Sequence, residues 1–122
     1  MLADNRRRGI SAWLASARTR NRAHHVVVGD AAELATVLRR IVRLLSRPGT
    51  DVLWSGYDSP AQLRAEVERY LIKIEAGESF DDDEFLGLRV LFAPTGPLQE
   101  TSISSGWARE FLDLAARFDA AS

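Results

Sequence analysis

The sequence predicts a small α+β domain, in which an antiparallel or mixed three-stranded sheet is covered by three main helices. Two observations indicate this class: long segments with apolar residues at helical spacing alternate along the chain with shorter apolar runs bounded by turn residues. With 122 residues, 46% of them apolar, the chain is long enough for one hydrophobic core. We therefore expect a basic N-terminal arm or short helix at residues 1–25 and a single α+β domain at residues 26–122.

Each of the three main helices is predicted from a capping residue followed by an apolar stripe. The first follows Asp30 and ends near Ser46, the second begins at Pro60, and the third follows Ser104 or Ser105. One helical face and one sheet face must cover each other, so these stripes should form the core. From the helices and the central strand together we expect the core to contain Leu38, Ile41, Val67, Leu71, Val90, Phe92, Phe111 and Leu114.

The strands of the predicted sheet are shorter segments. Leu88–Ala93 alternates between two apolar faces and is the expected central strand, and the turn residues Pro94–Pro97 would join it to a partner strand at Leu98–Ser104. Val52–Trp54 is the third predicted strand, and Val26–Val28 is a further short candidate.

The acidic run that precedes the central strand predicts one additional turn of helix. Carboxylates are favoured at the positive end of a helix dipole, and Asp81–Glu84 would supply them. We expect this turn to continue through Leu86 and to end at Gly87. A solvated helix start explains the acidic residues without a bound cation, and they lack the glycine and spacing of a calcium loop.

Charge is distributed unevenly along the chain. The formal net charge is −1, but residues 1–50 have a balance of +7 and residues 51–122 a balance of −8. Halves of opposite charge can attract each other within one fold or between two copies. Residues 1–22 contain too few apolar side chains to need burial, so we expect folding to tolerate their deletion.

Several kinds of chemistry lack support in the sequence. Cysteine is absent, which removes disulfides and thiolate chemistry and is typical of a cytoplasmic protein. The adjacent His24 and His25 would point to opposite faces of an extended segment, so we expect no metal site, and no cofactor-binding motif is present. No apolar run approaches the roughly 20 residues needed to cross a bilayer, so we expect no membrane partner.

The remaining hypothesis is a non-enzymatic protein-interaction or regulatory domain, similar to adaptors or immunity proteins, which binds a protein partner or self-associates. Aromatic anchors with a few polar groups are typical of interaction sites, although tryptophans such as Trp54 and Trp107 are more often core residues. The residues predicted to bind a partner are Trp54, Thr95, Gln99, Ser105 and Trp107.

Two alternatives remain open. One is a nucleic-acid-binding protein, because arginines in the first half could neutralise phosphates and Trp13 could stack on a base. The other is a small enzyme of unknown reaction, for which no catalytic residues are indicated. The residues of the nucleic-acid alternative are Arg6, Arg7, Arg8, Arg18, Arg20, Arg22, Arg39, Arg43 and Arg47.

Overall fold

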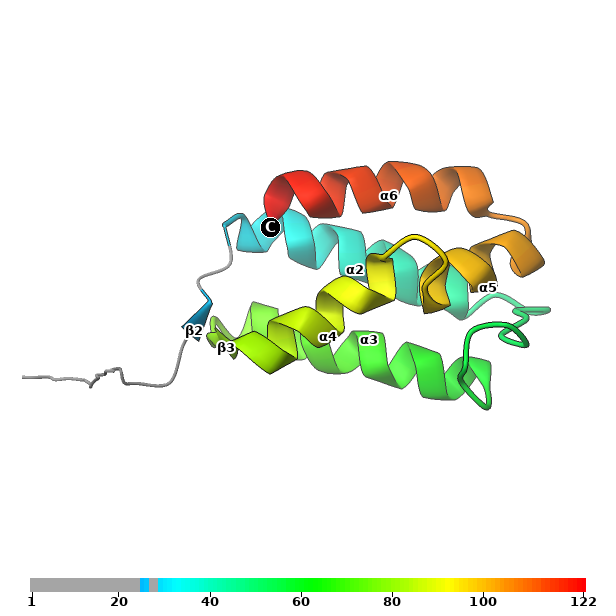
Figure 1. Cartoon of the computed structure of the whole chain (residues 1–122), viewed down its shortest axis with the longest axis horizontal. Coiled ribbons are helices and arrows are strands. Elements are labelled where there is room, and N and C mark those ends of the chain that lie inside the picture. Colours follow the sequence, from blue (N-terminus) through cyan, green and yellow to red (C-terminus); the bar gives the residue numbers. More distant parts are fainter. Residues whose placement is uncertain (1–24, 27–28) are drawn as a thin grey trace, which may run out of the picture. The chain divides into compact units, whose positions relative to one another are not determined.

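The computed structural model describes residues 25–26 and 29–122 and is mostly helical in this part of the chain (Figure 1). The chain divides into two compact units. The described part of the smaller unit consists of residues 25–26 and 79–85, and that of the larger unit of residues 29–78 and 86–122. The predicted three-stranded sheet covered by helices is wrong, because two of its three strands are helices and the third is a turn.

The smaller unit holds a minimal sheet and a helix start. Strand β2 (His25–Val26) pairs antiparallel with β3 (Phe80–Asp81), and each strand has two residues. The strand expected at Val26–Val28 thus overlaps β2 at Val26, and residues 27–28 lie outside the described residues. At the start of the following helix, the Glu84 N–H donates to Asp81 Oδ1 (2.8 Å) and the Asp81 N–H donates to Glu84 Oε1 (3.2 Å). This reciprocal pair is a capping box, so the acidic run starts a helix as predicted.

The larger unit is organised around helix α2 (Ala31–Leu45), which contacts both α3 (Pro60–Glu75) and α6 (Ala108–Ala121). Figure 1 shows α2 between these two helices. The apolar stripe of α2 is almost completely excluded from solvent, because its side chains face both neighbours. Its members with at most 1% exposed surface are Leu34, Val37, Leu38, Ile41, Leu44 and Leu45.

The ends of α2 and α3 follow the predicted capping signals. The Ser59 side chain caps α3 by accepting a hydrogen bond from the Gln62 N–H (3.1 Å), and Pro60 occupies the first helical position. Helix α2 ends at Leu45, next to the predicted stop near Ser46, and the Ser46 hydroxyl donates to the Val42 carbonyl (2.7 Å). Capping residues and a long apolar stripe agree at both helices, which is why their positions were predictable.

The predicted central strand is the second half of helix α4 (Asp82–Phe92). Leu88, Leu91 and Phe92 are buried, whereas Val90 is 49% exposed, which is the burial pattern of a helix and contradicts the expected core position of Val90. The single helical turn predicted at Asp81–Leu86 is therefore much longer, because it continues through Gly87.

Gly87 has a packing role within α4 instead of ending a helical turn. A Cβ atom at this position would collide with the hydroxyl oxygen of Tyr70 on α3. Glycine thus lets the Tyr70 ring approach the α4 backbone closely, at the cost of a residue with poor helix propensity. The sequence does not show that Tyr70 lies next to this glycine, and a glycine in this context therefore predicts a helix end.

The predicted hairpin is a connection between two helices. Helix α5 (Pro97–Ser105) replaces the strand at Leu98–Ser104, and its buried residues Leu98, Thr101 and Ser102 have helical spacing. Pro97 is the first helical residue, a position that suits its fixed φ and its missing N–H. Gly106, in the left-handed region at φ +89°, ends the helix, and α6 follows after Trp107.

Six of the eight residues predicted to form the core are buried. Leu38, Ile41, Val67, Phe92, Phe111 and Leu114 are buried, Leu71 is only half-buried, and Val90 is exposed. The rings of Phe92 and Phe118 stack with centroids 4.2 Å apart, so α4 and α6 share the aromatic part of this core. None of the helices in the described residues is both long enough and apolar enough to cross a bilayer.

Two leucines of α6 test this core directly. Leu114 is 2% exposed and Leu112 is 57% exposed. We expect Leu114→Ala to lower the free energy of unfolding by about 2–5 kcal/mol, because it leaves a cavity among packed side chains. Leu112→Ala should change it by less than about 0.5 kcal/mol. Urea denaturation followed by circular dichroism measures both, and equal effects of the two substitutions would contradict the orientation of α6.

Candidate functional site

The loop between α2 and α3 presents two large apolar side chains to solvent. Leu53 is 72% exposed and Trp54 is 70% exposed, and the two residues are adjacent in the chain. The predicted strand at Val52–Trp54 is instead a turn, in which only Val52 is buried. We call residues 51–58 the Trp54 loop.

Hydrogen bonds fix the backbone of the Trp54 loop. The Leu53 N–H donates to Asp51 Oδ1 (2.9 Å), and the Ser55 N–H donates to the Val52 carbonyl (2.9 Å). The Ser55 hydroxyl also donates to that carbonyl (2.7 Å) and accepts from the Tyr57 N–H (3.0 Å). Side-chain and backbone groups thus hold the turn from both ends, and the exposure of Leu53 and Trp54 results from an ordered backbone.

Helix α5 supports the same loop through Ser105. The Asp51 N–H donates to Ser105 Oγ (2.9 Å), which joins the start of the loop to the last residue of α5. Trp54 and Ser105, both predicted to bind a partner, therefore belong to one region of the structure. Ser105 has a supporting role in this region, because its hydroxyl is engaged by the loop backbone.

Trp107 lies in the core, unlike the exposed Trp54. Its side chain is 4% exposed, and its ring meets that of Phe111 edge to face at 6.5 Å. The indole Nε1 atom is buried and has no hydrogen-bond partner within the described residues. Trp107 is thus placed to stabilise the packing of α6, and only a small part of it is accessible, where it lines a hollow with Arg47 and Asp113.

Thr95 and Gln99 are at the other end of α5 and are engaged with each other. The Thr95 N–H donates to Gln99 Oε1 (2.6 Å), and the Thr95 hydroxyl donates to the Pro94 carbonyl (2.6 Å). Thr95 has a φ of +60°, which is unusual for a residue other than glycine, and the hydrogen bond that its N–H donates to Gln99 helps to hold that turn. These two residues organise the start of α5, and the structure does not bring them to the Trp54 loop.

The arginines of the nucleic-acid alternative are only partly described. Arg39 on α2 forms an ion pair with Glu75 on α3, with 3.1 Å between Nε and Oε2. Arg43 is exposed, and Arg47 lines a shallow hollow of about 370 Å³ together with Arg109, Glu110 and Asp113. Both signs of charge meet in this hollow. Arg6, Arg7, Arg8, Arg18, Arg20 and Arg22 lie outside the described residues.

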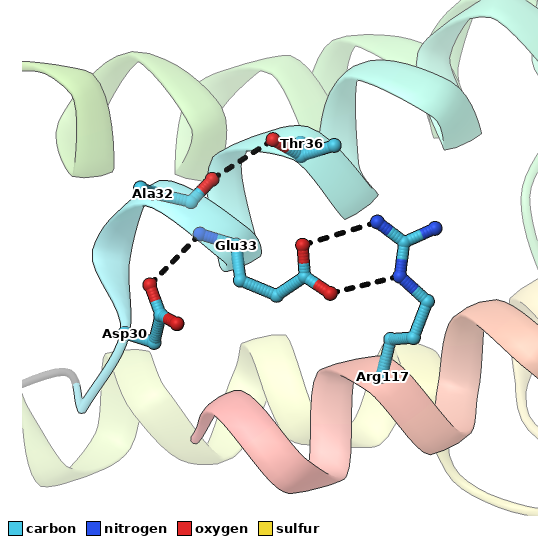
Figure 2. Close-up of polar contacts among 5 residues, drawn as sticks. All are labelled: Asp30, Ala32, Glu33, Thr36 and Arg117. Carbon is cyan, nitrogen blue, oxygen red and sulfur yellow. Dashed lines mark hydrogen bonds and ion pairs between the residues drawn. The ribbon is translucent and has the colours of Figure 1, made fainter.

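Charged pairs also connect α2 with α6, and they have a structural explanation. Both oxygens of the Glu33 carboxylate accept hydrogen bonds from Arg117, at 2.8 and 3.0 Å (Figure 2). Two helical turns further along, Arg40 makes a bidentate pair with Glu110. The partners are seven residues apart on each helix, which fits two antiparallel helices in one register. The side chains of both pairs remain partly exposed, so solvent screens their charges and the pairs contribute little to stability.

The start of α2 shows why Glu33 is free to reach α6. Asp30 Oδ1 accepts from the Glu33 N–H (3.0 Å), as the capping pattern predicts (Figure 2). The Asp30 N–H, however, donates to the Ala121 carbonyl (2.9 Å) and not to the Glu33 side chain. The Glu33 carboxylate is therefore available to Arg117, and this pairing lowers the pKa of Glu33. Within residues 25–26 and 29–122, no three carboxylate or imidazole groups are arranged to hold a metal ion.

Sequence reasoning missed the other exposed apolar side chains. From the sequence, Leu53 and Ile103 are expected in strands and Leu86 in a helical turn, and Ile72 and Leu112 have no predicted role, although all five are at least 57% exposed. Ile72 and Leu112 lie off the apolar stripes of their helices, which is a signal available in the sequence. For Leu53 no such signal exists, because a strand is predicted where the structure has a turn, and the single helical turn predicted around Leu86 is too short to define an apolar stripe.

No protein-family model matches the chain, and comparisons with curated proteins and with solved structures gave no significant match.

The pairing of Glu33 with Arg117 gives a pH-dependent expectation. In Arg117→Gln the cation is lost, so the pKa of Glu33 should rise toward its ordinary value, as measured by NMR of the side-chain carboxyl carbon. In the wild type, the pKa of Glu33 is lower in the folded state than in the unfolded state. The ion pair therefore stabilises the folded protein at pH values above the unfolded-state pKa, and this stabilisation is lost as the pH falls through the folded-state pKa. Arg109→Gln is the control, and an equal shift in both variants would contradict the assignment.

Proposed function

We propose that this chain is a non-enzymatic protein-interaction domain and that the Trp54 loop carries the contact. The observation that supports this proposal is the pair of adjacent apolar side chains, Leu53 and Trp54, exposed on a loop with a hydrogen-bonded backbone. Scattered apolar side chains are normal on protein surfaces, but two neighbours on an ordered turn form a defined feature that a partner can recognise.

The order of the loop favours binding. Association costs free energy for each mobile group that becomes fixed, and a loop that is already held by hydrogen bonds loses less freedom. The bond from Asp51 to Ser105 and those of Ser55 reduce that cost before any partner arrives. Tryptophan is also among the residues that most often dominate the energy of protein interfaces.

The chemistry of the loop indicates the kind of surface that would bind it. Leu53 and Trp54 project from a turn, so the partner should offer an apolar pocket that receives one or both side chains. Asp51 and Asp58, at either end of the Trp54 loop, are exposed carboxylates, and basic groups around the pocket would complement them. A regulatory or adaptor protein that acts by binding another protein fits this surface. Absence of cysteine fits a cytoplasmic location.

Nucleic-acid binding is less well supported. In α2, Arg39 is engaged by Glu75, and the hollow beside Arg47 contains the carboxylates of Glu110 and Asp113, which repel phosphate. For a small enzyme, the described residues offer no grouping of nucleophile and base that would define a reaction.

The proposal is tested by comparing three forms of the chain in quantitative affinity purification from cells that express it. The forms are wild type, Trp54→Ala and Ile72→Ala; Ile72 is the matched control, being 66% exposed but near the other end of α3. A partner retained by wild type and by Ile72→Ala should be lost with Trp54→Ala. With the purified partner, Trp54→Ala should weaken binding by about 2 kcal/mol, roughly thirtyfold.

Stability measurements separate a binding effect from misfolding. Because Trp54 is mostly solvent-exposed, Trp54→Ala should change the free energy of unfolding by less than about 0.5 kcal/mol. Partners that are recovered equally with wild type and with Trp54→Ala would contradict the proposal, as would a purified partner whose affinity is unchanged by the substitution.

A further inference from the structure

A second surface, formed by α4 and α6, is independent of the Trp54 loop. A groove of about 300 Å³ lies between residues of these two helices, and the buried rings of Phe92 and Phe118 contribute to its lining. Leu86 and Val90 line it from α4 and remain 59% and 49% exposed. All of the lining residues belong to the larger unit. We call this surface the α4–α6 groove.

The two exposed apolar residues of α4 lie on one face of the helix. Leu86 and Val90 are four residues apart and therefore lie one above the other on the helix. The neighbouring residues Ala93 and Pro94 extend this surface beyond the end of the helix. Covering Leu86 and Val90 would remove apolar area from water at about 25 cal/mol per Å².

Two opposite charges belong to the same groove, one from each helix. Arg89 on α4 and Asp119 on α6 both line it, and the side chain of neither has a hydrogen bond or ion pair within the described residues. Other charges of α6, Glu110 and Arg117, are already paired with α2. The groove thus carries an unpaired cation and an unpaired anion beside an apolar strip.

This arrangement is complementary to itself, and we propose that the occupant of the α4–α6 groove is a second copy of this chain. In a two-fold dimer, any contact from residue i to residue j is repeated from j to i. Arg89 of one copy then faces Asp119 of the partner, and Asp119 faces the Arg89 of that partner. The Leu86 and Val90 strips of the two copies cover each other between these ion pairs. The small groove makes this a weak, concentration-dependent dimer.

Reversal of the charge at position 89 or 119 distinguishes a dimer of this chain from a different occupant of the groove, because only in the dimer would a mixture of the two variants restore binding. A homodimer of Arg89→Asp contains two contacts between the new aspartate and Asp119, which repel each other. A homodimer of Asp119→Arg contains two contacts between arginines, which also repel each other. Each variant should therefore dissociate at least about tenfold more readily than wild type. When the two variants are mixed, every contact is again between opposite charges, so the heterodimer should form with an affinity within about threefold of wild type.

The measurement is sedimentation velocity at concentrations up to about 1 mM, with native mass spectrometry of one isotopically labelled variant to identify heterodimers. Val90→Asp should abolish the dimer, whereas Ile72→Asp, which is outside the groove, and Trp54→Ala should leave it unchanged. Circular dichroism verifies that each variant is folded. A wild-type chain that stays monomeric throughout this range, or a mixture that associates no better than its separate components, would overturn the proposal.

Discussion

The burial of helix α2 between α3 and α6 is the interaction on which the larger unit depends. Six side chains of its stripe are almost completely excluded from solvent, and each such burial contributes about 1.5–3 kcal/mol relative to exposure. Surface ion pairs from Glu33 and Arg40 to α6, and from Arg39 to α3, then fix the register of helices that apolar packing has already brought together. Because α2 is held in this way, the position of its C-terminal end, from which the chain continues into the Trp54 loop, is also held.

The sequence was sufficient to predict the helices whose caps and stripes agree, and it was not sufficient for the shorter elements. Over six residues, Leu88–Ala93 fits an alternating strand almost as well as a helix, and only the burial of Leu91 with exposure of Val90 separates the two. Gly87 and Pro97 were interpreted as a helix end and a hairpin turn, whereas one accommodates Tyr70 and the other starts α5. The role of Gly87 depends on a contact with a residue 17 positions earlier in the sequence, so tertiary context decides it, whereas proline suits either a turn or a first helical position.

The candidate site was predicted only in part, for a similar reason. Trp54 and Trp107 are indistinguishable by residue type, yet one is exposed on a loop and the other is buried against Phe111. A tryptophan that opens a helix with an apolar stripe is placed by that stripe, and a tryptophan in a turn is placed by the hydrogen bonds of its backbone. The bonds around Ser55 are local to the turn, but the bond from the Asp51 N–H to Ser105 Oγ joins segments that are 54 residues apart in the sequence. The proposed interaction surface therefore follows from the fold more than from any local motif.

Native-state hydrogen exchange of the α2 amides tests the central role of this helix most directly. If α2 holds the larger unit together, the amides of Leu38 and Ile41 can exchange only when the whole unit unfolds. Their free energies of exchange should then equal the free energy of unfolding measured by urea denaturation. Exchange of these amides at a clearly lower free energy, while amides of α6 such as that of Leu114 stay protected, would show that α6 remains folded without α2 and would contradict this account.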